Sequence, residues 1–159
     1  MNEVVRLTPE HDALPVLAHW HFVQWGYLRP GTNCTLTLAE LRRECTSQVV
    51  PSTYAAMIDG QPVGSVQLLA YDMDLRPEWS PWLASVFVVP QYRRRGIASQ
   101  LVRHAEKVAF STGIDTLYLY TPDQQTLYER LGWRRLENVG WCGERVTVMV
   151  KQSRQGEQP

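Results

Sequence analysis

Residues 84–102 constrain the fold of this chain more than any other segment. They begin with an apolar, β-branched run that breaks at Pro90 and continue through three consecutive arginines to Gly96. From there, apolar residues recur at helical spacing, at Ile97, Leu101, Val102, Ala105, Val108 and Ala109. The segment therefore predicts a strand, a short loop and a helix in direct succession.

The loop between this strand and this helix predicts a site for an anion. A helix that begins near Gly96 leaves its first backbone amides without intrahelical partners, and the helix dipole adds positive potential there. Gly96 lets a ligand approach the backbone, Ala98 and Ser99 keep the first turn uncrowded, and residues 93–95 are all arginine. These features favour phosphate. The sequence also permits a second interpretation, in which residues 92–96 form a solvated basic turn.

Two motifs in this part of the chain resemble those of one family. Arg93-x-x-Gly96-x-Ala98, after a Val-x-Val strand that ends in Pro90, resembles the acetyl-CoA motif of the GNAT superfamily of N-acetyltransferases. Further on, the run Leu127-Tyr128-Glu129-Arg130-Leu131-Gly132-Trp133 resembles the LYxxLGF element of that family. The order and separation of the two motifs also fit, so the pair is more specific than either motif alone.

The resemblance implies a single-domain, GNAT-like α/β fold. Its sheet is mixed and mostly antiparallel, with about six to seven strands and about four helices, and the strands at 83–89 and 116–120 splay apart. Apolar patterns, the Asp59-Gly60 hairpin signal and the N-cap candidates Thr37 and Asp123 place the elements. They predict strands at 4–8, 52–58, 61–70, 83–89, 116–120, 133–139 and 146–151, and helices at 10–25, 38–46, 96–112 and 123–131. We expect residues 1–151 to form the domain and residues 152–159 a polar tail.

Composition narrows the classes of protein that remain. The chain has 159 residues and balances 16 Lys and Arg against 16 Asp and Glu, which disfavours nucleic acid as a partner. Its three cysteines are not spaced as a zinc site, and its four histidines show no metal-ligand arrangement. No apolar run is long enough for a membrane span, and the N-terminus lacks a signal-peptide pattern. We therefore expect a cytoplasmic protein without metal or membrane attachment.

The resemblance implies that acetyl-CoA is the acyl donor. In the family, the pantetheine arm lies along the exposed backbone of the strand before the glycine loop, which here is Val86, Phe87 and Val88. The pyrophosphate meets the amides at the start of the following helix. The residues expected to bind the remainder of the donor are Arg93, Arg94, Arg95, Gly96, Ile97, Ala98 and Ser99. The strand can also be an ordinary packed strand, because its side chains can pack while its backbone binds.

Acetyl transfer by direct attack of an amine needs an acid for the departing thiolate and a base for the amine. The resemblance assigns the acid to Tyr128, for which the alternative is a tyrosine that only packs its helix on the sheet. The base is less defined, because the strand at 116–120 carries no acid. Asp74 and Glu78 are the candidate bases, together with Asp72, and the alternative is that these acids form a solvated rim that attracts amines.

Aromatic residues are abundant where an acceptor is expected. Trp25, Tyr27 and Trp79, together with Asp72, are the candidate substrate-binding residues, because ring faces and carboxylates both attract a cationic amine. Core packing is the alternative for each tryptophan. A small-molecule amine is the first expectation for the acceptor, and a peptide or protein amine is the second. A CoA-binding module without catalysis and an RNA-binding protein are the other classes, and a homodimer is compatible with the resemblance.

Overall fold

Seven strands form one mixed sheet in the order β1-β2-β3-β4-β5-β7-β6 in the computed structural model, which describes residues 2–153. The strands are β1 (Asn2–Arg6), β2 (Ser52–Ile58), β3 (Gln61–Leu69), β4 (Trp82–Val88), β5 (Thr116–Thr121), β6 (Arg134–Trp141) and β7 (Glu144–Gln152). The helices are α1 (Leu14–Trp25), α2 (Cys34–Arg43), α3 (Ile97–Ser111) and α4 (Gln125–Arg130), with short 3-10 turns at Gly26–Leu28 and Pro90–Tyr92. The expected fold class is confirmed. Of the tail expected at 152–159, Gln152 belongs to β7, and 154–159 lie outside the described residues.

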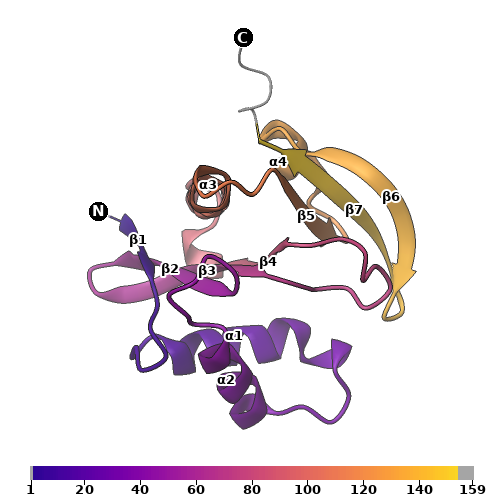
Figure 1. Cartoon of the computed structure of the whole chain (residues 1–159). Coiled ribbons are helices and arrows are strands. Elements are labelled where there is room, and N and C mark those ends of the chain that lie inside the picture. Colours follow the sequence, from indigo (N-terminus) through magenta and orange to yellow (C-terminus); the bar gives the residue numbers. More distant parts are fainter. Residues whose placement is uncertain (1, 154–159) are drawn as a thin grey trace.

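Helices cover both faces of the sheet. Figure 1 shows α1 and α2 below β2 and β3, α3 above them, and β5, β6 and β7 rising on the far side of β4. The largest apolar cluster lies between α3 and the sheet, and a second lies between the sheet and helices α1 and α2. The two faces of the sheet are thus available for different parts of a site.

The sheet opens between β4 and β5. These strands are parallel and share a single register pair, Trp82 with Tyr118, whereas β4 stays paired with β3 as far as Val88. Trp82 to Ala84 are buried, and the next three residues, 85–87, are only half-buried. The predicted splay is confirmed, because β4 loses its neighbour after its first residues and exposes a backbone edge.

Gly64 lets α3 approach this part of the sheet closely. A Cβ atom at Gly64 would lie 2.8 Å from the carbonyl oxygen of Phe87 and 3.0 Å from a methyl carbon of Leu101. Ile97 and Leu101, both buried, fill the space above it. The start of α3 is therefore fixed beside the end of β4.

Three helix starts differ from the sequence prediction by two or more residues. α1 begins at Leu14 rather than at residue 10, with a proline in its first turn, where proline is favoured. α2 begins at Cys34 rather than at residue 38, because the Asn33 side chain caps it by accepting a hydrogen bond from the Leu36 amide at 2.9 Å. The hydroxyl of Thr37, the predicted cap, instead donates to the Asn33 carbonyl. α4 begins at Gln125 rather than at Asp123, and the Thr121 hydroxyl accepts from the Gln124 amide at 2.9 Å. In α2, Asn33 thus reaches an unpaired amide in place of Thr37. In α4, Thr121 holds the amides of residues 123 and 124 in a turn ahead of the helix, and no side chain caps its first amides.

Candidate active site

The start of α3 has the geometry of an anion site. Gly96 is the N-cap residue, with φ of 80° and ψ of 8°, and no side chain caps the first amides of the helix. Arg94 also has a positive φ, 65°. No atom lies within 4 Å of the position that a Cβ atom would take at Gly96. A phosphate can therefore approach the amides of Ile97, Ala98 and Ser99 without obstruction.

The three arginines of the loop do not act as one patch. All three are exposed. Arg93 donates from Nε to the Val88 carbonyl at 2.8 Å, and its guanidinium lies 5.6 Å from the centre of the Phe87 ring. The guanidinium of Arg95 lies 5.0 Å from the centre of the Tyr92 ring. The loop is thus held against β4 by its own side chains, and the Val88 carbonyl already has a partner.

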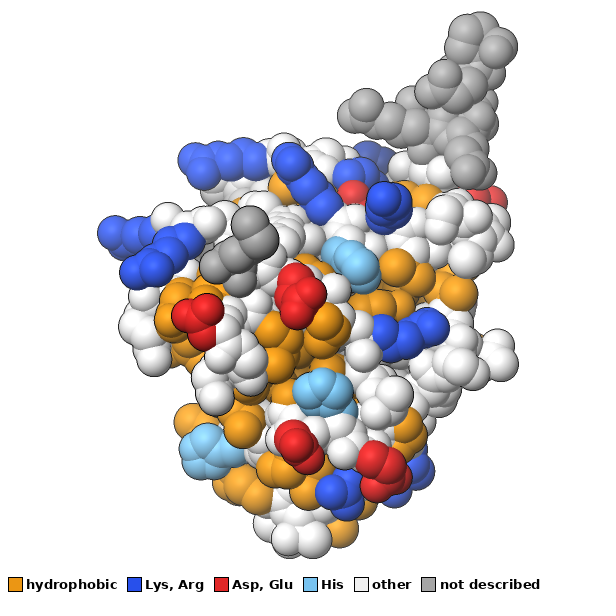
Figure 2. Space-filling model, turned by 90° about the vertical axis from the view of Figure 1, so that its left-hand side faces the viewer, with side chains coloured by type: hydrophobic (Ala, Val, Ile, Leu, Met, Phe, Trp, Pro, Cys, Tyr) orange, Lys and Arg blue, Asp and Glu red, His pale blue; other side chains and the backbone are white. Residues whose placement is uncertain are grey.

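Positive charge is unevenly distributed over the surface. On the face shown in Figure 2, Lys and Arg side chains gather along the upper part, and acidic side chains lie mostly below them. No basic stripe runs across the whole of this face. This distribution suits a local anion site better than a long nucleic-acid strand.

Side chains at the open edge of β4 pack on both faces of the sheet. Val86 packs against the core beneath α3, and Phe87 turns toward α1. There the Phe87 ring stacks on Trp20 with centroids 5.2 Å apart and meets the edge of Trp25 at 6.3 Å. Because these two neighbouring side chains pack on opposite faces of the sheet, neither covers the backbone between them. That backbone faces the gap beside β5.

Tyr128 lies on α4 with its ring in the core. It is 7% exposed, and its ring meets Trp133 edge-on with centroids 6.2 Å apart. Among the described residues, the Tyr128 hydroxyl has no hydrogen-bond partner. Every fully buried side-chain oxygen or nitrogen among those residues does have a partner, so the Tyr128 hydroxyl cannot be fully buried. The hydroxyl is therefore the part of the side chain that reaches solvent. Burial, and next the charge of Asp123, raise the pKa of Tyr128 above its ordinary value. The phenol therefore keeps its proton at neutral pH.

The three acids expected near the acceptor differ in how far they are buried. Asp74 and Glu78 are exposed, and Asp72 is half-buried. Burial raises the pKa of Asp72 to about 7, Arg29 opposes this shift, and Glu44 and Glu40 add to it. Asp72 was expected to bind substrate, and it has the ionisation that a base at neutral pH needs.

Among the described residues, no ring contact joins two of the candidate substrate-binding aromatics to each other. Trp25 packs against His21 and Phe87, at centroid distances of 5.3 and 6.3 Å. Tyr27 is exposed, and partial desolvation and then the nearby carboxylate of Glu144 raise its pKa. Trp79 stacks on Tyr118 at 5.4 Å with an interplanar angle of 4°, and the Arg76 guanidinium lies 5.6 Å from its centre. The Trp79 ring is therefore already engaged by its own neighbours.

Sequence reasoning missed several residues on this face. Burial raises the pKa of Tyr120, and the charge of the nearby Asp72 raises it further. Arg29 forms an ion pair with Glu40. The alternation of β5 could have indicated that Tyr118 and Tyr120 share a face. The approach of residues 29 and 40 to Asp72 has no comparable signal, because they lie in distant segments.

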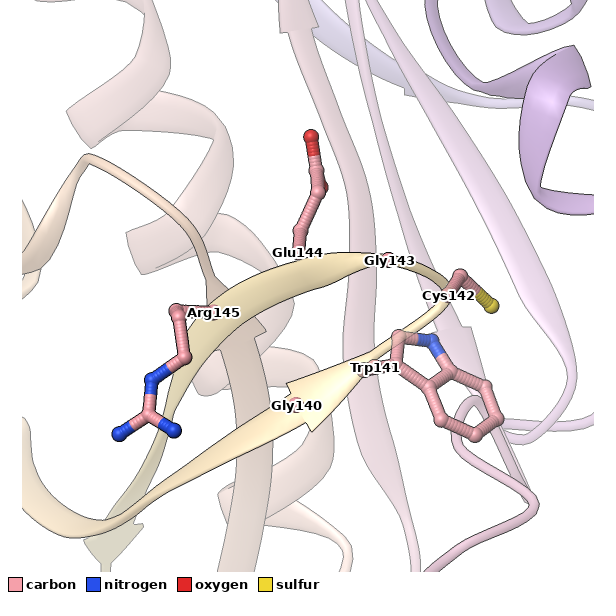
Figure 3. A pocket seen from close by; sticks show the side chains of 6 residues that line it. All are labelled: Gly140, Trp141, Cys142, Gly143, Glu144 and Arg145. Carbon is pink, nitrogen blue, oxygen red and sulfur yellow. The ribbon is translucent and has the colours of Figure 1, made fainter.

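A hollow of about 300 Å³ lies at the turn between β6 and β7, lined by residues 140–145. Figure 3 shows Trp141 and Cys142 pointing to one side of this hairpin and Arg145 to the other. No residue of α3 or α4 lines it, so it is distinct from the anion site and from Tyr128. Within residues 2–153, no group of three His, Cys, Asp or Glu side chains could hold a metal ion, and no helix there is long and apolar enough to cross a membrane.

Comparisons with known proteins agree with this geometry. A family model described as the acetyltransferase (GNAT) family matches residues 15–133. An aminoglycoside 6'-N-acetyltransferase complexed with coenzyme A has a similar structure, with a TM-score of 0.75 at 16% identity over 94% of this chain and 96% of that one. An aminoglycoside 6'-acetyltransferase type Ii gives 0.72 at 19% identity, over 94% and 96%. A GNAT-family acetyltransferase from Streptococcus pneumoniae gives 0.71 at 18% identity, over 96% and 99%. No curated protein matches the sequence.

Proposed function

The chain belongs to the acetyltransferase (GNAT) family of acetyl-CoA-dependent acyltransferases, and we propose that it moves the acetyl group to the primary amine of a small molecule. The observation that carries the proposal is the open edge of β4 beside the uncapped start of α3. The open edge of β4 can pair with the amide groups of a pantetheine arm, and the start of α3 can bind a pyrophosphate. One donor molecule contains both groups.

In this proposal, the donor lies along Val86 and Phe87 with its pyrophosphate at the amides of residues 96–99. The side chains of Val86 and Phe87 are packed on opposite faces, which leaves their backbone to the ligand. Arg93 also holds the loop onto β4 through the hydrogen bond from its Nε to the Val88 carbonyl. Arg94 and Arg95 remain exposed to attract the phosphates.

Tyr128 is the proposed general acid. When the amine attacks the thioester carbon, the C–S bond breaks and the sulfur leaves as a thiolate, which needs a proton. Tyr128 keeps its proton at neutral pH, and its hydroxyl is the part of the side chain that reaches solvent. Its pKa makes transfer to the thiolate unfavourable in water, so its contribution depends on alignment.

Asp72 is the proposed base, in preference to Asp74 and Glu78. A primary amine is almost wholly protonated at neutral pH and must lose a proton before or during attack. The raised pKa of Asp72, about 7, allows it to take that proton, directly or through water. The two exposed acids lack a comparable surrounding.

The acceptor is proposed to be a cationic amine bound on the α1–α2 side of the sheet. Three acids, Glu40, Glu44 and Asp72, lie close enough to Arg29 for their charges to raise its pKa, which makes this region favourable for a cation. Two of the structurally similar proteins are aminoglycoside acetyltransferases, whose substrates are small molecules with several amines. A peptide or protein amine remains the second candidate, and the cytoplasmic location and the homodimer remain predictions.

The first test is the thermal midpoint with acetyl-CoA, CoA or ATP. A ligand at about 100 times its Kd should add roughly 2.7 kcal/mol, which for a domain of this size is about 5 to 11 °C. We expect a shift with acetyl-CoA and CoA but not with ATP. The absence of a shift with any of them would contradict the donor site.

The second test measures thiol release with a panel of small amines. We expect Tyr128→Phe to lower kcat about 100-fold without changing the Kd of acetyl-CoA. Tyr54→Phe is the matched control, because Tyr54 is a buried tyrosine on β2. An unchanged kcat in Tyr128→Phe would refute the acid, and binding of acetyl-CoA without thiol release for any amine would favour a non-catalytic module.

A further inference from the structure

One residue of β4 has a backbone conformation that strands do not normally contain. Ser85 has φ of 57°, in the left-handed region. Among the described residues, the other non-glycine residues with positive φ are Asp59, Arg94 and Cys142, and all three lie in turns or loops. A strained residue inside a strand persists only where its surroundings hold it, and such residues are enriched at functional sites.

Ser85 forms a bulge at the point where β4 becomes an open edge. Ser65 of β3 pairs with Phe87, whereas Gln67 pairs with Ala84, so Ser85 and Val86 together face one residue of β3. The bulge lies directly before Phe87 and within the half-buried stretch of the strand. It therefore sets the direction of the backbone that the donor is proposed to use.

Two buried side chains of β3 hold this bulge. The Ser65 hydroxyl donates to the Ser85 carbonyl at 2.8 Å, and the Ser85 hydroxyl donates to Gln67 Oε1 at 2.6 Å. Ser65 is 0% exposed and Gln67 is 2% exposed. Ser85 is thus bonded through both its backbone and its side chain to a rigid central strand.

The same two side chains connect the bulge to both helices of the acceptor face. Because Ser65 gives its one hydroxyl proton to Ser85, the hydrogen bond of 2.9 Å between His21 Nε2 and Ser65 Oγ must be donated by the histidine. Gln67 donates from Nε2 to Glu44 Oε1 at 2.9 Å, at the end of α2. The chain of hydrogen bonds therefore runs from α1 and α2 to β4.

We propose that Ser65 and Gln67 are positioning residues for the acyl donor, which hold Ser85 left-handed and thereby keep the β4 edge in its donor-binding form. The proposal rests on the proposed acetyl-CoA site along β4. Neither side chain needs to touch the donor, since each acts through the conformation of Ser85. A purely structural role would instead affect stability and leave donor binding unchanged.

The test compares two substitutions at one position. Ser85→Ala and Ser85→Gly both remove the hydroxyl that bonds to Gln67, but only glycine adopts a positive φ readily. We expect Ser85→Ala to weaken acetyl-CoA binding about tenfold, which is about 1.4 kcal/mol, and Ser85→Gly to stay within about threefold of wild type. Titration calorimetry measures both Kd values.

A rescue experiment then tests the role of Ser65. Ser65→Ala should weaken acetyl-CoA binding about tenfold, and the double variant with Ser85→Gly should recover to within about threefold of Ser85→Gly alone. Ser52→Ala is the matched control, because Ser52 is also 0% exposed and donates to a backbone carbonyl, that of Val49, at 2.6 Å. It should leave the Kd unchanged.

The outcomes separate this proposal from the one it rests on. If wild type does not bind acetyl-CoA, the donor site itself is wrong. If wild type binds and Ser85→Ala binds equally well, or Ser85→Gly fails to rescue Ser65→Ala, then Ser65 does not act through the bulge and the inference is overturned. If Ser65→Ala does not fold, the comparison of the two Ser85 variants decides.

Discussion

Lowering the pH should weaken the fold through one buried histidine. His21 is 8% exposed, and burial lowers its pKa from 6.5 to about 4. Its Nε2 atom donates to Ser65, and the lowered pKa keeps the ring neutral in the folded protein at neutral pH. Protonation of the second ring nitrogen would place a charge between α1 and the sheet with little water to solvate it.

The direction of the change in stability with pH follows from the two pKa values of His21. In the unfolded chain His21 gains a proton near pH 6.5, but in the folded protein only near pH 4, so between these values the unfolded state binds more protons. The contribution of His21 is therefore present above pH 6.5 and is lost as the pH falls. Between pH 7 and pH 5, linkage gives a loss in the free energy of unfolding of about 2 kcal/mol.

Urea unfolding at both pH values measures this loss, with His21→Gln as the reference. The glutamine amide can still donate to Ser65 but does not titrate. The difference between the two proteins isolates the histidine, because Asp72 titrates in both and its raised pKa changes stability in the opposite direction. If wild type and His21→Gln respond equally to pH, the reasoning about His21 is refuted.

Three further changes test other parts of the structure. Asp72→Asn should lower kcat/KM and abolish its rise through about pH 7, and a retained rise would exclude Asp72 as the base. Lys151→Met should cost about 3 kcal/mol in urea unfolding, because Lys151 Nζ lies 2.7 Å from the buried carboxylate of Glu106, and a loss below 1 kcal/mol would refute this. Gly96→Ala should weaken CoA binding at least tenfold, since its Cβ would occupy the open approach to α3. Gly113→Ala at the other end of α3 is the matched control, with a positive φ of 100° and open space, and equal effects of the two substitutions would mean that strain alone is responsible.

Local patterns in the sequence predicted most of the fold. The strand, loop and helix of residues 84–102 were predictable because apolar periodicity, Pro90 and Gly96 are all local signals. The hairpin at Asp59-Gly60 joins β2 and β3 as expected. The start of α2 was not predictable, because Asn33 and Thr37 both carry oxygens that can cap a helix. Only the folded chain shows which of them reaches an unpaired amide.

The candidate site was less predictable than the fold. The motif around Gly96 indicated the candidate anion site, but the raised pKa of Asp72 depends on burial and on Glu44, which is distant in the sequence. The left-handed conformation of Ser85 has no sequence signal either, because serine rarely adopts it. Both features arise from contacts among segments that meet only after folding.

The single pair between Trp82 and Tyr118 has a mechanical consequence. The seven strands are continuous in order, yet within residues 2–153 the register pairing between β4 and β5 is limited to that one pair. The two halves remain joined by side chains, because Leu83 of β4 and Leu119 of β5 belong to the same buried cluster beneath α3. The gap is therefore a slot between packed halves, and a ligand bound along β4 would fill it like an additional strand.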